Sequence, residues 1–328
     1  MSEPVLQQQV VASMSVGGHV AVWRGRLWAM FAVAVVLFTV ATQLSAVSLW
    51  GALACPFSLH AAVCALPLLL AAVLVRRWWV VAVLTVCVGV LSAHTVSLWL
   101  ERPGLVDGAT RTLHVASANV LGYNRNLELA VSTAADLDAD VLAIIEVTPP
   151  VEALLEGLRA EYPHQAVEPQ TLNFGLAIVS RLPLRDVRAW TPEGTSVATM
   201  TARVEVDGAE LLVVAAHLFP PVGVGAWQER NRYLRAMAEV VRGEPRVVLL
   251  GDLNAPGEDA AFRRLLTDGG LRDSRAGRGR FASWPAPLGL AGIVLDHILV
   301  GAGVQVDERR SGWIPGSDHD WVDARIRF

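Results

Sequence analysis

This 328-residue sequence has very little cysteine and no lysine. Its three cysteines, Cys55, Cys64 and Cys87, all fall within an apolar N-terminal region. The polar remainder of the chain therefore cannot form a disulfide, although it is large enough to be stabilised by a buried core instead. All 27 basic residues are arginines, so every positive side-chain charge at neutral pH other than a protonated histidine belongs to a guanidinium.

Charge is missing from three long stretches near the N-terminus. The ranges 27–50, 52–75 and 78–100 contain no Asp, Glu, Lys or Arg. About 20 apolar residues cross a bilayer as a helix, so each range predicts a transmembrane helix. A cleaved signal peptide is a poorer explanation, because its apolar core is shorter and would not occur three times. The hydrophobic content of 53% and the mean hydropathy of +0.42 are too high for a purely soluble protein.

Arginines predict the orientation of these helices. Arg24 and Arg26 precede the first stretch, and Arg76 and Arg77 separate the second from the third, whereas the turn between the first two is uncharged. The positive-inside rule therefore places the N-terminus in the cytoplasm and, after three crossings, the rest of the chain outside a cytoplasmic membrane. The predicted order is a cytoplasmic tail, three transmembrane helices, a linker and an extracytoplasmic domain, at residues 1–26, 27–100, 101–111 and 112–328.

The polar domain has no excess of positive charge. Four of the 27 basic residues and one of the 31 acidic residues precede Glu101, so the segment from Glu101 onward carries seven more acidic than basic residues. A general nucleic-acid binder usually has a basic surface, because phosphate neutralisation dominates its affinity. General nucleic-acid binding is therefore not expected. A local patch such as Arg275, Arg278 and Arg280 still leaves a surface nuclease open.

One predicted strand ends on residues that suit catalysis. Residues 247–250 are Val-Val-Leu-Leu, typical of a strand buried on both faces, and the following glycine permits a change of direction. Asp252 and Asn254 come at the exit of this strand, where they can face a shared cleft. Asp and Asn are also common turn residues, because their side chains bond to the nearby backbone. Taken alone, this pattern leaves a simple turn and a functional site equally open.

The same arrangement recurs through the polar domain. Strands are expected at 113–118, 141–145, 176–179, 198–206, 210–216, 247–250, 294–300 and 321–326, and helices at 126–138, 151–160, 227–242 and 260–266. Polar residues follow many of these strands or occupy loop ends, namely Asn119, Glu146, His217, Asp252, Asn254 and the pair Asp318–His319. Because strand-terminal residues can converge at one rim of a sheet sandwich, this repetition predicts an active site.

Ordered motifs over residues 111–328 give this pattern a family resemblance. They are Ser-Ala-Asn119, Ile-Ile-Glu146-Val, Gly175-Leu-Ala-Ile-Val-Ser-Arg, Ala-Ala-His217-Leu, Gly-Asp252-Leu-Asn254-Ala, Leu-Asp296-His-Ile-Leu and Gly-Ser-Asp318-His319. In this order they resemble the endonuclease/exonuclease/phosphatase superfamily. The resemblance implies an α/β fold, a four-layer sandwich of two mixed sheets flanked by helices, with the active site at one edge. It also implies metal-assisted hydrolysis of a phosphate ester.

The resemblance implies a role for each matched residue. Mg²⁺ or Mn²⁺ prefers hard oxygen ligands, which makes Glu146 the best metal ligand, helped by Asn119 and Asp318. Asp252 would orient or deprotonate the attacking water. Three residues would contact the phosphoryl oxygens, namely Asn254, His217 and protonated His319. Asp296 would orient His319, and Asn173 would contact the substrate. His297 is left without a role, because many family members have an aromatic residue there.

Three functions remain open from the sequence alone. The first is a membrane-tethered phosphoesterase, for which we expect a membrane-proximal, lipid-linked phosphate as substrate, since three spans followed by this domain resemble the membrane-bound VanJ-type members. Those members are associated with glycopeptide-antibiotic resistance, which suggests a lipid pyrophosphate carrier as substrate. The second is an extracellular nuclease acting on DNA or RNA. A non-enzymatic scaffold is the third, and it would be expected to lose Glu146, Asp252 or His319, all of which are present.

Overall fold

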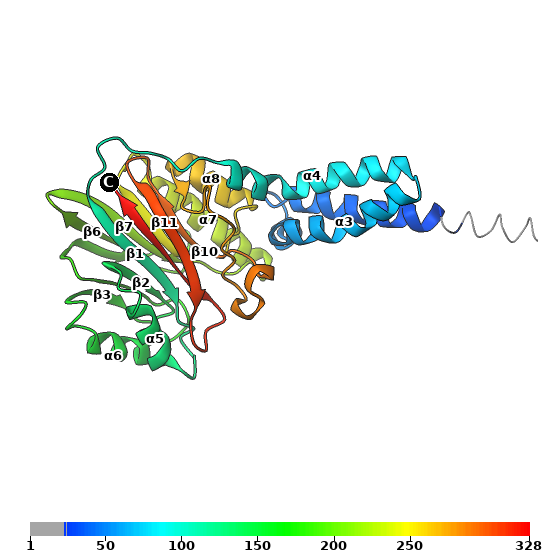
Figure 1. Ribbon diagram of the computed structural model, residues 1–328. Coiled ribbons are helices and arrows are strands. Elements are labelled where there is room, and N and C mark those ends of the chain that lie inside the picture. Colours follow the sequence, from blue (N-terminus) through cyan, green and yellow to red (C-terminus); the bar gives the residue numbers. More distant parts are fainter. Residues whose placement is uncertain (1–22, 24) are drawn as a thin grey trace, which may run out of the picture. The chain divides into compact units, whose positions relative to one another are not determined.

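The computed structural model describes residue 23 and residues 25–328 (Figure 1). The chain divides into two compact units. One unit comprises Met1–Gln43 and Phe57–Ala93, and the other comprises Leu44–Pro56 and His94–Phe328. The predicted cytoplasmic tail lies almost wholly outside the described residues, and so does Arg24.

The described residues include three helices that are long and apolar enough to cross a membrane. They are Gly25–Gln43, Leu49–Leu74 and Trp78–Leu100, the last being α4. The second consists of α2 (Leu49–Ala54), the short 3₁₀ helix η1 (Cys55–Phe57) and α3 (Ser58–Leu74). Their length and apolar composition indicate that the chain is anchored in a membrane.

The first predicted span ends earlier than expected. The sequence predicts one helix over 27–50, whereas the observed helix stops at Gln43 and a turn follows. Ser48 then caps α2, because its side chain accepts a hydrogen bond from the backbone N–H of Gly51 at 3.5 Å. Charge content alone could not locate this boundary, since the turn is as uncharged as the helices beside it.

The second unit contains two six-stranded mixed sheets. The first sheet has the order β11 (Gln305–Trp313), β12 (Asp320–Arg327), β1 (Thr112–Asn119), β2 (Val141–Ile145), β4 (Leu176–Ser180) and β3 (His164–Glu168). The second has the order β5 (Leu184–Trp190), β6 (Thr199–Val206), β7 (Ala209–His217), β8 (Val247–Asp252), β10 (Asp296–Val300) and β9 (Arg272–Asp273).

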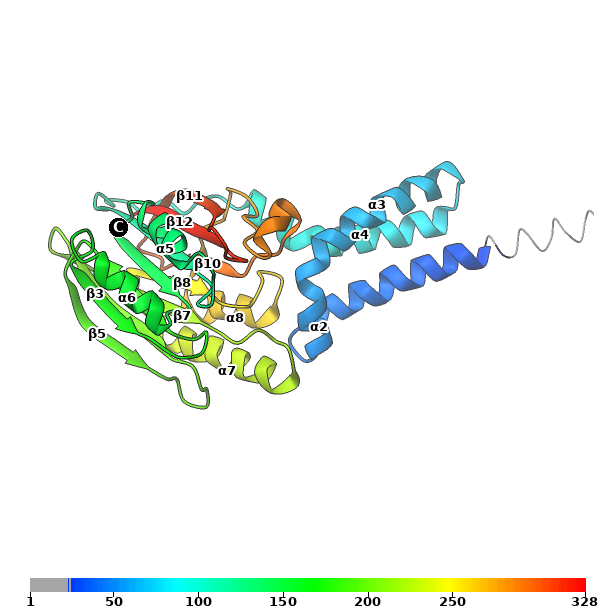
Figure 2. The same cartoon turned by 90° about the horizontal axis from the view of Figure 1, so that it is seen from below.

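Helices cover the outer face of each sheet (Figures 1 and 2). The helices α5 (Leu127–Ala135) and α6 (Pro149–Gly157) pack on the first sheet, and α7 (Val224–Val241) and α8 (Ala260–Gly269) pack on the second. A third apolar cluster fills the space between the two sheets. The four-layer α/β sandwich that the motifs implied is therefore confirmed.

The strand β8 shows why these residues form a double-faced core. Val248 and Leu250 belong to the cluster between the sheets, whereas Val247 and Leu249 belong to the cluster beneath α7 and α8. Successive side chains of a strand point to opposite faces, so a strand covered on both sides needs an unbroken apolar run. The Val-Val-Leu-Leu sequence supplies that run, and the first polar side chain appears where the strand ends.

Strand direction brings the polar strand ends together. β1 is parallel to β2 in the first sheet, and β7 is parallel to β8 in the second, so each pair ends at one edge. β10 is antiparallel to β8, with Asp296 opposite Asp252. The start of β10 therefore reaches the same edge as the end of β8. This edge, which we call the site edge, carries the residues discussed next.

Candidate active site

The site edge collects side chains from both sheets. Asn119 ends β1, Glu146 follows β2, His217 ends β7, Asp252 ends β8, Asp296 begins β10 and His319 precedes β12. All six are buried. The two sheets are joined directly here, because the side-chain amide of Asn119 donates to Asp252 at 3.2 Å. Residues separated by up to 200 positions in the chain thus form one cluster.

Asp252 lies at the centre of this cluster. Its Oδ2 atom accepts the Asn119 hydrogen bond and lies 3.5 Å from Nε2 of His217 and 3.6 Å from Nε2 of His319. The other oxygen, Oδ1, accepts the backbone N–H of Asn254 at 3.0 Å. Burial raises the pKa of Asp252 to about 7, an effect that the charge of His319 opposes. A carboxylate with a pKa near neutrality can exchange a proton with water at working pH.

His319 and Asp296 form a buried pair. Nδ1 of His319 lies 2.8 Å from Oδ2 of Asp296, and the backbone N–H of Asp296 donates to Ser283 at 3.1 Å. Burial lowers the pKa of His319, but the charges of Asp296 and Asp252 outweigh burial and raise it to about 10. The pKa of Asp296 is lowered, because the charge of His319 and its hydrogen bond outweigh burial. The two carboxylates therefore favour the imidazolium form of His319, whose Nε2 lies 3.6 Å from Oδ2 of Asp252.

Glu146 is held in a strained backbone conformation. Its φ angle is 68°, a left-handed value that costs energy for a residue with a side chain. Oε1 accepts from Asn119 at 3.2 Å, and Oε2 accepts from the backbone N–H of Gly122 at 3.0 Å. Burial raises the pKa of Glu146, although both hydrogen bonds oppose the rise. Asn254 also has a positive φ, of 46°, but asparagine adopts this region readily, so the strain is specific to Glu146.

The donor set suits a hard divalent cation. Among the described residues, no arginine forms an ion pair with Glu146, Asp252 or Asp296. Asp318 accepts the indole N–H of Trp284 at 2.8 Å through Oδ2, while its buried Oδ1 has no hydrogen-bond partner in the described part of the chain. A buried carboxylate oxygen without a donor, such as Oδ1 of Asp318, fits a metal ion.

Two overlapping groups could hold that ion. The motifs predicted Glu146, Asn119 and Asp318, and Asn119 links directly to Glu146. Ligand atoms of Asp252, Asp296 and His319 also lie within 4.8 Å of one another. His319 is a poor ligand in this arrangement, because Asp296 stabilises its protonated form and raises its pKa to about 10, and a metal binds only neutral imidazole. The assignment of Glu146, Asn119 and Asp318 stays a prediction that the geometry accommodates.

The predicted phosphate-binding residues lie beside the cluster. His217 packs against the ring of Phe174, with centroids 4.9 Å apart, and burial lowers its pKa to about 3. His217 is therefore neutral, and it can offer one N–H donor. Asn254 uses one amide hydrogen on the carbonyl of Leu218 at 2.8 Å, which leaves the other for a ligand. Asn173 precedes Phe174, and its backbone lies close to His217.

Several supporting residues escaped the sequence argument. Arg230 is fully buried in α7, donates to the carbonyl of Asn254 at 2.7 Å, and pairs with Asp259 at 2.6 Å. It lies three residues after Trp227, on the apolar stripe of that helix, so a charged residue in an apolar stripe was the available signal. Ser317 accepts the backbone N–H of His319 at 3.1 Å and donates to the carbonyl of Asn119 at 2.7 Å. No strand-end pattern marks these supports.

The possible arginine patch does not form. Arg275 is buried and pairs with Asp273 at 2.7 Å. Arg278 donates to the backbone carbonyls of Ala276 and Val306, and Arg280 donates to that of Leu290. His297 is buried beneath Phe262 and bonds to the carbonyl of Ala255 at 3.0 Å, away from the cluster. These basic groups are used to hold loops in place.

Comparisons with known proteins agree with this geometry. The model of the Endonuclease/Exonuclease/phosphatase family matches residues 116–319. TDP2 from D. rerio, solved with a single-strand DNA product, is 19% identical, with a TM-score of 0.56 over 66% of this chain and 99% of that one. The 3′ phosphatase NExo from Neisseria, solved with a product DNA hairpin, is 22% identical, with a TM-score of 0.53 over 65% of this chain and 98% of that one.

A third solved structure comes from Beutenbergia cavernae and is itself described as an endonuclease/exonuclease/phosphatase. It is 19% identical, with a TM-score of 0.54 over 67% of this chain and 72% of that one. No curated protein sequence matched. The structural likenesses concern the fold, whereas the family match spans the motifs from the end of β1 to His319. The chain therefore belongs to the endonuclease/exonuclease/phosphatase family of metal-dependent phosphoester hydrolases.

Proposed function

We propose that this protein is a membrane-anchored phosphoesterase that cleaves a membrane-proximal phosphate ester or pyrophosphate on the outer side of the cytoplasmic membrane. The observation that carries this proposal is the union, in one chain, of three apolar helices and a buried carboxylate–histidine cluster. Tethering keeps the domain at high effective concentration near lipid headgroups. The resemblance of this arrangement to VanJ-type members supports a lipid-linked substrate, such as a carrier of cell-wall precursors.

The residues of the cluster suggest how the reaction proceeds. Asp252, with its pKa near 7, orients the attacking water and accepts its proton. The imidazolium of His319 faces the same space and donates a charged hydrogen bond to the phosphoryl oxygens as their negative charge grows. Asp296 keeps that ring oriented and protonated. The free amide hydrogen of Asn254 adds a neutral donor.

A divalent cation, Mg²⁺ or Mn²⁺, completes this proposal. Glu146 and Asp318 would hold it through carboxylate oxygens, and Asn119 through its carbonyl oxygen, which accepts one hydrogen bond from Leu121 and keeps a second lone pair. When bound, such an ion neutralises phosphate charge and orients the substrate. The strained φ of Glu146 aims its carboxylate at Asn119, which fits a preorganised ligand better than a residue placed for packing.

Nuclease activity is the alternative. The D. rerio and Neisseria structures both contain product DNA, which is a property of those proteins. Here the acidic balance of the domain opposes binding of a polyanion, and the three arginines that could have formed a basic patch are engaged in internal contacts. A small membrane-proximal phosphate, unlike a nucleic acid, can be bound by the positive charge of the site alone and needs no extended basic surface.

The direct test uses the full-length protein in lipid nanodiscs with Mg²⁺. Three substrates are compared: a prenyl pyrophosphate, a phosphodiester lipid and plasmid DNA. We expect turnover of the prenyl pyrophosphate, and its loss with a chelator. Glu146→Gln should raise the metal concentration for half-maximal activity by about 10-fold or more. The control is Glu161→Gln, which breaks an ion pair with Arg181 at the surface and should leave metal dependence unchanged.

Two results would overturn the proposal. Efficient plasmid cleavage without turnover of either lipid would show that the protein is a nuclease. A reporter fused after Phe328 that is active only in the cytoplasm would contradict the extracytoplasmic location of the domain.

A further inference from the structure

Three of the loops beside the cluster contain no charged residue. The others do contain charge: Arg125 follows β1, Glu258 follows β8 and Asp318 precedes β12. The three uncharged loops span residues 169–175, 218–223 and 281–295. Each touches the site: Phe174 packs on His217, the carbonyl of Leu218 accepts from Asn254, and Trp284 donates to Asp318. Loops in water are normally rich in polar and charged residues. Three uncharged loops that each touch a polar site therefore need an explanation.

These loops also expose large apolar side chains. We call the set the apolar rim, and its members are Leu172, Val222, Val224, Leu288 and Leu290. Val222 is 82% exposed and Leu290 is 88% exposed, among the most exposed apolar side chains of the polar domain. Single exposed apolar residues are ordinary, but four on the three loops and a fifth, Val224, at the first residue of α7 suit an apolar partner.

The ends of the membrane helices belong to the same compact unit as this edge. Ser45 comes two residues after the helix Gly25–Gln43, and its hydroxyl accepts the backbone N–H of Ala260 at the start of α8 at 3.0 Å. Leu98 lies in the last turn of α4, and its carbonyl accepts the N–H of Gly277 at 2.8 Å. Both acceptors are within three residues of the end of a candidate span. By chain continuity, the bilayer surface must begin near these contacts.

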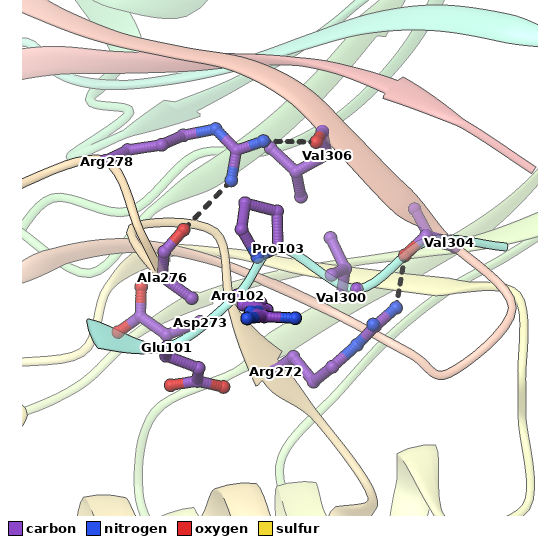
Figure 3. A pocket seen from close by; sticks show the side chains of 11 residues that line it. Glu101, Arg102, Pro103, Arg272, Asp273, Ala276, Arg278, Val300, Val304 and Val306 are labelled. Carbon is purple, nitrogen blue, oxygen red and sulfur yellow. Dashed lines mark hydrogen bonds between the residues drawn. The ribbon is translucent and has the colours of Figure 1, made fainter. Parts of the chain in front are cut away.

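The linker after α4 is held against the same unit. Figure 3 shows Pro103 between Arg278 and Arg272, whose guanidinium groups are anchored on the carbonyls of Val306 and Val304. The cavity left there is only about 20 Å³, and a side chain at Gly104 would collide with Arg272. The linker residues Pro103 and Gly104 are therefore packed against the unit that contains the site.

We infer that the apolar rim inserts into the interfacial layer of the bilayer that holds the chain's own helices. The uncharged loops can enter this layer without desolvating a charge, and the apolar tips gain by leaving water. The occupant is a lipid surface, because the span ends contact the start of α8 and Gly277 in the same unit, and the rim offers no charged group to a protein partner. This inference rests on the proposed function in one respect: it lets a membrane amphiphile present its phosphate to Asp252 without leaving the bilayer.

The first test measures depth and does not depend on activity. Spin labels are attached in the full chain carrying Cys64→Ala, at Leu290→Cys, Val222→Cys and, as a control on the edge strand β5, Val187→Cys, which is also exposed. In nanodiscs, the first two labels should be more accessible to oxygen than to a water-soluble nickel chelate, and the third should show the reverse. Equal accessibility at Leu290 and Val187 would overturn the inference. A second result would also overturn it: in detergent, the label at Leu290 stays inaccessible to the nickel chelate only when two copies of the chain associate. That result would mean that a second copy, and not lipid, covers the rim.

The second test separates the rim from the chemistry. The variant Val222→Ser, Val224→Ser, Leu288→Ser, Leu290→Ser should lose about tenfold or more turnover of a prenyl pyrophosphate in nanodiscs, because the phosphate no longer meets the site at the bilayer surface. Hydrolysis of bis(p-nitrophenyl) phosphate in solution should change by less than about twofold, because no rim side chain contacts the cluster. Equal losses on both substrates would overturn the inference. If the native protein cleaves neither substrate, the proposed function fails. The depth measurement still shows whether the apolar rim inserts into the bilayer.

Discussion

The two ends of the sandwich differ in whether their carboxylates are paired with arginines. At the site edge, the carboxylates of Glu146, Asp252 and Asp296 have no arginine partner among the described residues. Toward the other end, carboxylates pair with arginines, as in Arg181–Asp138 at 2.6 Å and Arg203–Glu244 at 2.9 Å. Three loops beside the site differ in the same way, because 136–140 and 242–246 each carry three charged residues, whereas 169–175, 218–223 and 281–295 carry none.

Two buried histidine–aspartate pairs make this comparison sharp. His319–Asp296 at the site edge and His114–Asp323 on β1 and β12 both have a distance of 2.8 Å. Asp323 is also bonded to Arg310 at 2.6 Å, so its charge is balanced within the protein. No arginine pairs with Asp296 among the described residues. Under the proposed function, the same pair of side chains serves stability at one place and chemistry at the other.

The largest expected effect comes from removing the histidine of each pair. His319→Ala should lower kcat/KM for phosphoester hydrolysis by about 10³-fold, because a charged donor to the phosphoryl oxygens is lost. His114→Ala should leave kcat/KM nearly unchanged and reduce the free energy of unfolding by about 1–3 kcal/mol, because it removes a buried hydrogen bond. Steady-state kinetics and denaturant unfolding of the purified full-length protein measure both quantities. A similar loss of activity in the two variants would contradict the distinction between a catalytic pair at the site edge and a structural pair at His114.

An intermediate effect concerns pH. Asp252 must lose its proton to act as a base, and its pKa is about 7, so kcat/KM should rise tenfold per pH unit below 7 and then level off. His319 must keep its proton, and its pKa is about 10, so activity should fall again only near that value. This raised pKa also means that the contribution of His319 to the free energy of unfolding is complete below pH 6.5 and lost as the pH rises through 10.

The variant Asp296→Asn sharpens this pH prediction. Among the effects that raise the pKa of His319, the charge of Asp296 is the largest. Its removal should move the alkaline limb of the pH profile down by about 1–3 units, while the acidic limb, which belongs to Asp252, moves less. A profile recorded over pH 5–11 distinguishes this result from a structural role for Asp296. If Asp296 had only a structural role, activity would fall by the same factor at every pH, and neither limb of the profile would move.

The interior of the fold could be predicted from the sequence, whereas its borders could not. Buried strands such as β2 and β8 are unbroken apolar runs, and their observed bounds lie close to the predicted ones. The strands that were missed, β3, β5, β9 and β11, are the four edges of the two sheets. Edge strands are partly exposed and protected by charge, so the sequence of β5, Leu-Arg-Asp-Val-Arg-Ala-Trp, reads as a polar loop.

The residues of the site likewise fall into those that the sequence predicted and those that it did not. Residues at strand ends, such as Glu146 and Asp252, were predicted because a polar side chain after an apolar run is a local signal. Ser283, which bonds to the backbone of Asp296, and Arg230, which bonds to the carbonyl of Asn254, act across 13 and 24 residues. Their contribution depends on which loops meet in space, and a single sequence holds no local record of that. The apolar rim was equally hidden, because exposure of a leucine is decided by the folded loop around it.

The smallest expected effect lies on one of the missed edges. Arg185 on β5 pairs with Glu205 on β6 at 2.5 Å, and the arginine side chain is 59% exposed. Solvent screening and side-chain entropy leave such a pair worth less than about 1 kcal/mol, so Arg185→Gln should lower the free energy of unfolding by no more than that, with kcat/KM unchanged. Urea unfolding with and without 0.5 M NaCl, about five times the ionic strength at which the Debye length is 10 Å, checks this, since salt should remove most of the difference. A large, salt-insensitive loss would mean that the charged end stabilises the fold as strongly as the buried pairs do.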